Sequence, residues 1–131
     1  YAAMGRDLYR DNAVFRSALD RCETLLAPRL GESLLQLLFE TDGARLSETR
    51  LTQPALFAIG YALTELWQAL GITPAAVAGH SAGEFAAAVT AGILSLEDAA
   101  HLIAERARLM QDAPRGAMLA VMAPAARAQE A

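Results

Sequence analysis

The chain has 131 residues, 54% of them hydrophobic and 20% charged, which predicts one globular domain with a buried core and excludes an intrinsically disordered segment. Its net charge of −4 and its lack of lysine argue against nucleic acid as a partner. The single cysteine, Cys22, cannot form an internal disulfide and is expected in the core, and no Cys/His cluster has metal-ligand spacing. No apolar run is long enough for a membrane span and no signal peptide is evident, so we expect a cytoplasmic protein without a metal or a membrane contact.

The first fifty residues are predicted to be mostly helical. Asn12 is suited to cap a helix whose apolar side chains follow the helical period as far as Leu26. The stretch 33–40 begins with a capping serine and predicts a short buried helix, whereas 41–50 is polar and predicts a loop.

A long apolar helix is predicted in the middle of the chain. Thr52 is its expected cap, Pro54 lies in its first turn, and Gly71 is its expected end. Because this helix is apolar on nearly every side, we expect it to be sandwiched inside the domain. Pro74 then breaks the chain, and residues 75–79 are a short strand candidate.

The remaining pattern predicts a strand that leads into helices. A helix is expected over 82–91 with Gly92 as its stop, and Ser95 with Asp98 predicts a capping box at the start of the next helix. The apolar stretch 116–122 is a second strand candidate. Strands that enter helices indicate an α/β fold, but two strands make a poor sheet, so the rest of the sheet is expected from residues outside this chain.

The stretch 79–83, Gly-His-Ser-Ala-Gly, matches the G-x-S-x-G pattern in which a sharp strand-to-helix turn exposes a nucleophilic serine, here Ser81. Gly79 and Gly83 are expected to be required because a side chain at either position would collide with the neighbouring strand or helix. The N–H group of Ala82 would then supply half of an oxyanion hole. The alternative is a tight turn in which the serine only caps the following helix.

A serine nucleophile needs a general base within hydrogen-bond reach, and neither histidine suits. His80 is the immediate neighbour of Ser81, and adjacent side chains on such a turn diverge, so we expect a structural role for it. His101 lies on a polar helix face that it shares with Glu105, Arg108 and Asp112. We therefore expect the base to lie outside this chain.

Arg106 occupies an unexpected position on the helix that begins near Leu96. It falls within an apolar stripe whose other members are Leu96, Ala99, Ile103 and Met110. A guanidinium on a core-facing stripe requires an anionic partner, because it cannot lose its charge. That partner is either a structural carboxylate or the carboxylate of a substrate held in a bidentate pair.

Several linked motifs resemble one family. The segments LTQPALFAIGYAL, GHSAGEFAAAVTAGILSLEDAAHLIAERARLMQ and GAMLAV, in this order and spacing, are similar to malonyl-CoA:acyl carrier protein transacylases, above all to acyltransferase domains of modular type I polyketide synthases. The resemblance covers essentially all residues and includes the amino-terminal stretch from Tyr1. It implies a partial α/β-hydrolase-like subdomain over 1–115, with a parallel sheet and flanking helices, which runs into the first strand of a ferredoxin-like subdomain at 116–131.

The resemblance also implies roles for individual residues. Ser81 would carry the acyl group as an ester, Ala82 would contribute to the oxyanion hole, and Arg106 would bind the free carboxylate of a malonyl-type extender. Gln53, in the family's TQPA segment, and His80 would support the site. The acyl group would pass from coenzyme A to the phosphopantetheine thiol of an acyl carrier protein, without a tightly bound cofactor. Further partners would be the ketosynthase and other domains of the same synthase.

The chain also departs from the family pattern. Members of the family begin with a strand that ends in a GQGSQ-like segment, and their catalytic histidine lies in a later part of the domain. Neither feature is present here, so we expect an amino-terminal portion that is inactive in isolation. Two alternatives remain open: a non-catalytic remnant that acts as a scaffold or docking element within a synthase, and a serine esterase, which would not explain Arg106.

Overall fold

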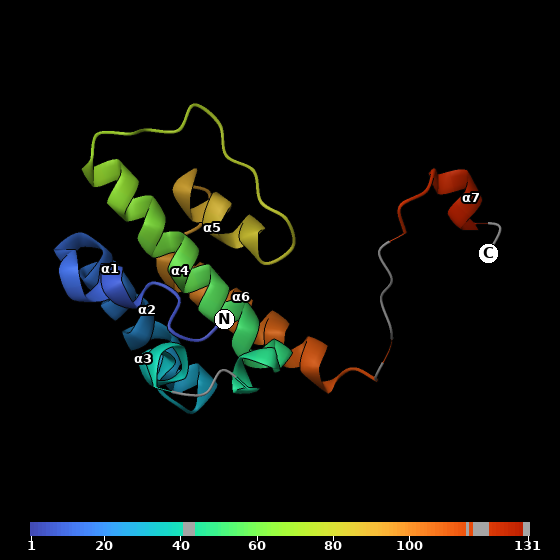
Figure 1. Ribbon diagram of the computed structural model, residues 1–131, viewed down its shortest axis with the longest axis horizontal. Coiled ribbons are helices and arrows are strands. Elements are labelled where there is room, and N and C mark those ends of the chain that lie inside the picture. Colours follow the sequence, from blue (N-terminus) through green and yellow to red (C-terminus); the bar gives the residue numbers. More distant parts are fainter. Residues whose placement is uncertain (41–43, 115, 117–120, 130–131) are drawn as a thin grey trace.

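The computed structural model describes residues 1–40, 44–114, 116 and 121–129, and every regular element in these ranges is a helix. Figure 1 shows their arrangement along the chain. The elements are α1 (Arg6–Asp11), α2 (Ala13–Leu30), α3 (Leu34–Phe39), the short 3₁₀ turn η1 (Ala44–Ser47), α4 (Thr49–Ala69), α5 (Gly83–Thr90), α6 (Leu96–Asp112) and α7 (Ala125–Gln129).

Three helices begin at the caps predicted from the sequence. The Asn12 side chain accepts hydrogen bonds from the first N–H groups of α2, the Ser33 hydroxyl accepts one at the start of α3, and the Ser95 hydroxyl accepts one from Asp98 at the start of α6. Each bond satisfies an amide that the helix itself leaves unpaired. These three predictions are confirmed. A cap can be predicted from the sequence because it depends only on residues a few positions away.

The long helix α4 begins at Thr49, so the prediction that Thr52 caps its start was wrong. The Thr52 hydroxyl donates to the carbonyl oxygens of Leu46 and Glu48 and does not accept from a free helix amide. Part of the stretch predicted as a loop is consequently helical, in η1 and in the first turn of α4, while residues 41–43 lie outside the described residues.

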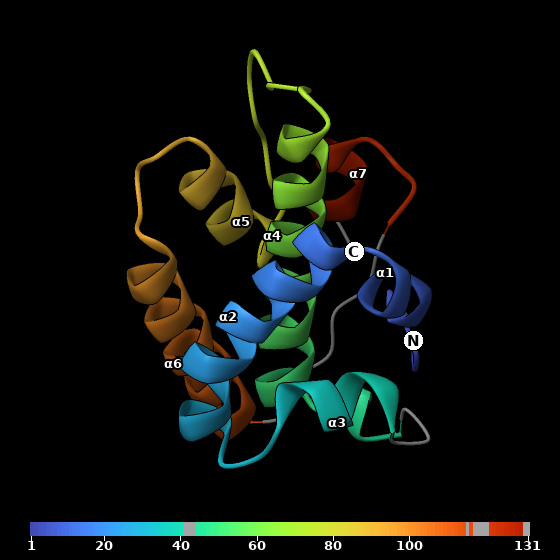
Figure 2. The same cartoon turned by 90° about the vertical axis from the view of Figure 1, so that its left-hand side faces the viewer.

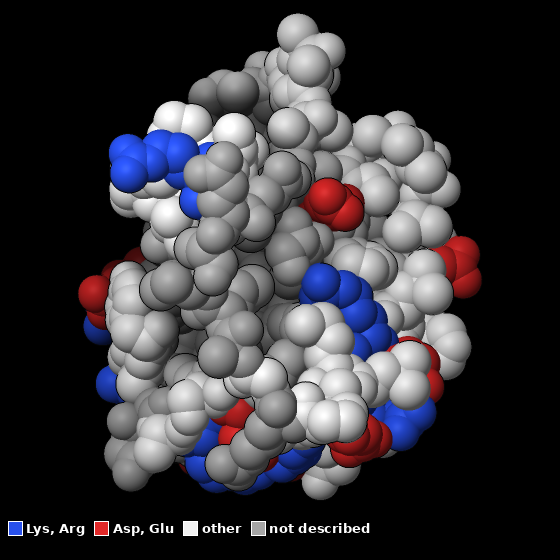
Figure 3. Space-filling view, turned by 90° about the vertical axis from the view of Figure 1, so that its right-hand side faces the viewer, with Lys and Arg blue, Asp and Glu red and all other residues white. Residues whose placement is uncertain are grey.

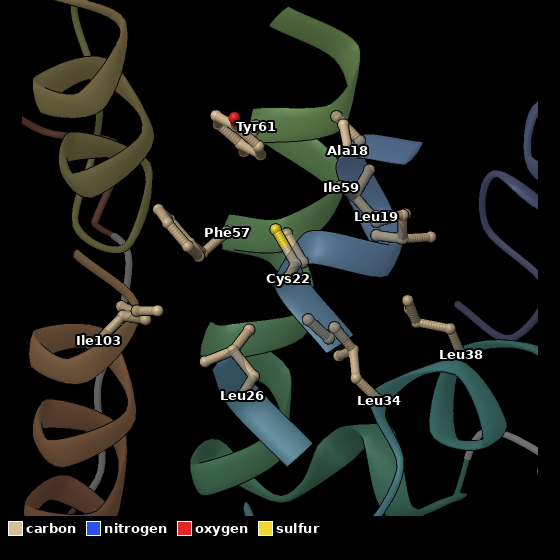
Figure 4. Packing of buried hydrophobic residues seen from close by; sticks show 14 of the residues in the cluster. Ala18, Leu19, Cys22, Leu26, Leu34, Leu38, Phe57, Ile59, Tyr61 and Ile103 are labelled. Atoms are coloured by element: carbon tan, nitrogen blue, oxygen red, sulfur yellow. The ribbon is translucent and has the colours of Figure 1, made fainter. Parts of the chain in front are cut away.

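Helices α2, α4 and α6 pack against one another around the main apolar core, with α3 and α5 at its margins (Figure 2). Figure 4 shows this packing, in which Cys22 lies fully buried as expected. Each fully buried large side chain stabilises the fold by about 1.5–3 kcal/mol. The largest of them are Phe15, Leu19, Leu26, Phe57 and Ile103. Helix α4 is thus sandwiched as predicted only as far as Ala62; none of its later residues is buried, and Leu56 and Trp67 are about half exposed.

The predicted strand at 75–79 does not form. Residues 72–80 instead pass as an exposed, extended segment from α4 to α5, visible as the long connection in Figure 1. A strand is defined by its pairing with a neighbour, and the described part of the chain offers none. Of the second candidate at 116–122, residues 117–120 lie outside the described residues, and the other three have no regular structure.

The surface carries charges of both signs. Basic and acidic side chains lie close together on the face seen in Figure 3. Within the described chain, ion pairs such as Arg45–Glu32 and Arg50–Glu48 join charges of opposite sign. None of the helices in the described ranges is both long and apolar enough to cross a lipid bilayer.

Candidate active site

Ser81 lies in the sharp turn that leads from the extended segment into α5. Its backbone φ is +54°, in the left-handed region that residues other than glycine rarely adopt. The turn is closed by hydrogen bonds from the Gly83 amide to the His80 carbonyl oxygen, at 3.0 Å, and from the Glu84 amide to the Ser81 carbonyl oxygen, at 3.1 Å. Such a conformation costs roughly 1–3 kcal/mol and concentrates at functional sites. The Ser81 residue is exposed, as a nucleophile must be.

The two glycines of the turn differ in their importance. A Cβ atom at Gly79 would lie 2.3 Å from the backbone carbonyl carbon and oxygen of Gly83 and 2.4 Å from the Glu84 nitrogen, so glycine is required there. A Cβ atom at Gly83 would meet no described atom within 4 Å. The expectation of a collision is confirmed for Gly79 and is wrong for Gly83 within this chain.

Ala82 follows the serine and precedes the first residue of α5. It is 9% exposed, and its N–H group makes no hydrogen bond within the described part of the chain. An amide at this position has the positive end of the helix behind it. The arrangement leaves one donor free beside Ser81, where it can bind a negatively charged oxygen.

Arg106, on α6, connects the turn to α4. Its Nη2 donates to the Ser81 Oγ at 3.0 Å, and its Nη1 donates to the Gln53 Oε1. The structure thus brings together three residues that the sequence analysis singled out, from three separate elements. No carboxylate of the described residues pairs with Arg106, so the structural partner left open by the sequence is not found there. The half-buried guanidinium is available to an anion.

Gln53 is the one polar side chain among the buried residues of the described chain, at 9% exposure. Its Oε1 accepts from Arg106, and its Nε2 donates to the Met110 Sδ at 3.2 Å. The sequence placed Met110 in the buried stripe of its helix, but this residue is 50% exposed. Its contact with Gln53 was missed, and the only available signal was its position one turn after Arg106 on the same helix face.

Neither histidine is hydrogen-bonded to Ser81 in the structure. His80 and His101 are both exposed. His101 shares its face of α6 with an ion-paired cluster in which Arg108 binds Glu105 at 2.6 Å and Asp112 at 2.9 Å. The hydrogen bond from Arg108 holds the pKa of Glu105 below its ordinary value. This face is therefore a solvated polar surface, as the sequence predicted.

A cavity of about 830 Å³ lies between α4, the extended segment and α5, and the sequence did not predict it. Ser81 and Arg106 do not line this cavity. Its walls include Trp67, Ile72, Val77, His80, Ala86 and Thr90. Within the described ranges, no three Asp, Glu, His or Cys residues are placed to hold a metal ion.

Comparison with known proteins gives one consistent family. The sequence model of the acyl transferase domain family matches residues 1–131 of this chain. The chain is 44% identical to the spectinabilin polyketide synthase system protein NorC of Streptomyces orinoci, over 99% of this chain and 6% of that protein. It is 48% identical to erythronolide synthase EryA3 of Saccharopolyspora erythraea, over 85% of this chain and 3% of that protein.

Solved structures agree with these matches. The acyltransferase domain from the second module of the salinomycin polyketide synthase superposes with a TM-score of 0.80 at 46% identity, over 88% of this chain and 27% of that one. The acyl transferase domain of ZmaA superposes with a TM-score of 0.81 at 36% identity, over 88% of this chain and 28% of that one. The chain therefore spans under a third of these two structures and a small part of the curated relatives named above.

Proposed function

The chain belongs to the acyl transferase domain family, and on this premise we propose that it carries the nucleophile of a polyketide synthase acyltransferase that moves a malonyl-type group from coenzyme A to an acyl carrier protein. One observation carries the proposal: Arg106, without a carboxylate partner in the described chain, donates to the Ser81 Oγ at 3.0 Å. A hydroxyl nucleophile and a permanent cation side by side are suited to an acyl donor that also bears a free carboxylate.

In the first half-reaction, the Ser81 oxygen forms a bond to the thioester carbonyl carbon of the acyl-CoA while a general base takes the hydroxyl proton. The carbonyl oxygen becomes negatively charged and accepts a hydrogen bond from the free N–H of Ala82. Collapse of this intermediate breaks the carbon–sulfur bond, and coenzyme A leaves as a thiol with the proton returned by the base. Ser81 is left as an acyl ester.

In the second half-reaction, the phosphopantetheine thiol of the carrier protein attacks the ester carbonyl carbon. The general base takes the proton of this thiol, the carbon–oxygen bond to Ser81 breaks, and the base passes the proton to the departing serine oxygen. The acyl group leaves as a new thioester on the carrier protein. Donor and acceptor use the same serine in turn, which predicts ping-pong kinetics. Neither half-reaction requires a tightly bound cofactor.

Arg106 would bind the free carboxylate of the extender through two parallel N–H···O bonds. The guanidinium nitrogen that contacts Ser81 would turn to the substrate, while Gln53 holds the other nitrogen. His80, exposed beside the turn, would support the site from outside the reacting atoms. The two glycines would shape the elbow, with Gly79 indispensable.

The base and the central sheet would come from the rest of the protein. The extended segment at 75–79 has its backbone exposed, and its place before the elbow is that of a strand in an α/β-hydrolase-like sheet. We assign residues 1–115 to this subdomain and 116–131 to the start of a ferredoxin-like one. The partners would be the acyl carrier protein, the ketosynthase and the other domains of a cytoplasmic synthase.

The test is intact-mass measurement after incubation with malonyl-CoA, on this chain and on the complete protein that contains it. We expect a malonyl adduct in the complete protein, its loss in Ser81→Ala, and no adduct in the chain alone. Rapid stoichiometric acylation of the chain alone would refute an external base. Absence of an adduct from both proteins would overturn the enzymatic proposal in favour of a scaffold or docking element.

The esterase alternative loses its basis because the family matched is that of acyl transferases.

A further inference from the structure

The side-chain amide of Gln53 is held at both of its ends. Its oxygen accepts from the Arg106 Nη1, and its nitrogen donates to the Met110 Sδ at 3.2 Å. Because Gln53 is 9% exposed, water has little access to replace either partner. A buried amide that lost one of these bonds would carry an unsatisfied polar group.

The two neighbours fix which way the amide faces. A guanidinium has five donors and no acceptor, so of the two ends of the Gln53 amide only the oxygen can pair with Arg106. A thioether sulfur accepts and cannot donate, so Met110 is satisfied only by the nitrogen. An amide turned by 180° would set N–H against N–H at Arg106 and oxygen against sulfur at Met110. Both contacts therefore favour the same orientation.

We propose that Met110 is a positioning residue that acts through Gln53 on Arg106. Its sulfur holds the amide nitrogen, the amide oxygen then holds one guanidinium nitrogen, and the other guanidinium nitrogen faces Ser81. Packing alone does not account for Met110, because the residue is 50% exposed. A leucine would fill much the same space and would accept no hydrogen bond.

This role rests on the proposed function, in which Arg106 binds the carboxylate of the acyl donor. Loss of the sulfur would leave the Gln53 amide free to turn, so that a smaller fraction of molecules would present an aligned guanidinium. The carboxylate binds before the acyl group is transferred, so the cost should fall on donor binding and not on the maximal rate. A donor without a carboxylate should be unaffected.

The experiment follows single-turnover acylation of Ser81 by intact mass, in the complete protein, against the concentration of malonyl-CoA or acetyl-CoA. In Met110→Leu the half-saturating malonyl-CoA concentration should rise by about three- to tenfold, the range of a single neutral hydrogen bond, with the maximal rate and the acetyl-CoA reaction unchanged. Met110→Gln should restore much of the wild-type value, because its carbonyl oxygen, one bond farther from the backbone than the sulfur, can accept from the Gln53 amide. Met4→Leu is the matched control, because Met4 packs against the core and its sulfur makes no hydrogen bond among the described residues.

A double-mutant cycle with Gln53→Leu separates positioning from packing. Once the amide is gone, Met110→Leu should have no further effect. Equal losses with both donors, an equal loss in the Gln53→Leu background, or no change in Met110→Leu would each overturn the inference.

A spectroscopic arm keeps this test separate from the proposed function. In the 131-residue chain, the Gln53 side-chain amide resonances should shift in Met110→Leu and stay in place in Met4→Leu. If wild-type protein forms no malonyl adduct, the proposed function fails, and these resonances still decide whether Met110 orients Gln53. Unchanged resonances in Met110→Leu would overturn the positioning role.

Discussion

Arg106 and Ser81 lie 25 positions apart in the sequence and are joined by a hydrogen bond of 3.0 Å between Nη2 and Oγ. The serine is held in a left-handed backbone conformation, and the arginine has no carboxylate partner in the described chain. Each group thus satisfies part of the other's hydrogen-bonding capacity. A carboxylated acyl donor could take the place of the serine on the guanidinium and leave the hydroxyl free to react.

The first prediction concerns Arg106→Ala in the complete protein. Transfer from malonyl-CoA should fall by about 10- to 100-fold in kcat/KM, the range of a lost charge-assisted hydrogen bond, while transfer from acetyl-CoA should not fall. Arg106→Lys should lie between, because it keeps the charge and loses the planar fork. Rates of Ser81 acylation measure both. Equal losses with the two donors would show that Arg106 supports the fold and not the carboxylate.

The two glycines of the elbow give a second prediction. Gly79→Ala places a Cβ atom 2.3 Å from backbone, so it should lower the free energy of unfolding by about 1–3 kcal/mol or more. Gly83→Ala meets no described atom and lies at the first position of a helix, so it should change that free energy by less than about 1 kcal/mol in this chain. Urea unfolding of the two variants measures the difference, and equal destabilisation would contradict the collision at Gly79.

A third prediction tests the core with two leucines. Leu26 on α2 is 0% exposed, and Leu26→Ala should cost about 2–5 kcal/mol of unfolding free energy through lost burial and the cavity left behind. Leu56 on α4 is 48% exposed, and the same substitution there should cost less than about 1 kcal/mol. Similar urea midpoints for the two variants would mean that α2 does not pack on α4 as described.

The fourth prediction follows from Cys22. Burial raises the pKa of its thiol from 9.0 to about 12. The folded protein therefore keeps this proton at a pH where the unfolded chain has lost it. The stabilisation is complete below about pH 9 and is lost as the pH rises toward about 12.

The free energy of unfolding should accordingly fall by about 1 kcal/mol between about pH 8 and pH 10, since one pKa unit corresponds to about 1.4 kcal/mol. Urea unfolding at the two pH values measures the change. Cys22→Ala is the control, because a chain without the thiol should show a smaller fall over the same interval. An equal fall in both proteins would assign the pH dependence to other groups.

Local interactions explain the part of the fold that the sequence predicts well. The caps at Asn12, Ser33 and Ser95 involve amides two or three residues away, so composition and spacing were sufficient. The prediction of a cap at Thr52 was wrong because the hydroxyl of this residue donates to carbonyl oxygens of the preceding turn. A threonine hydroxyl can form this bond as well as accept from a helix amide, and the sequence does not distinguish the two. The strand predicted at 75–79 does not form, because a strand needs a neighbouring strand to pair with and a local pattern cannot supply one.

The site was predictable to a similar extent. The G-x-S-x-G pattern singled out Ser81 and the apolar stripe singled out Arg106, because each signal lies within one short stretch; the structure brings these two residues together. The bond from Gln53 to Met110 joins positions 57 apart on two different helices. Its existence depends on how α4 and α6 cross, which helical periodicity does not determine.

The three-way contact at Arg106 also has a consequence for the assembly of the protein. Gln53 and Ser81 reach Arg106 across 53 and 25 positions, so the contact exists only after α4, the turn and α6 have all docked. A chain with α6 detached would carry the same serine and lack the cation beside it. Under the proposed function, the fraction of molecules that accept a carboxylated acyl group in preference to a plain one would therefore report how many molecules in a preparation have α6 docked, and would serve as a covalent assay of correct folding.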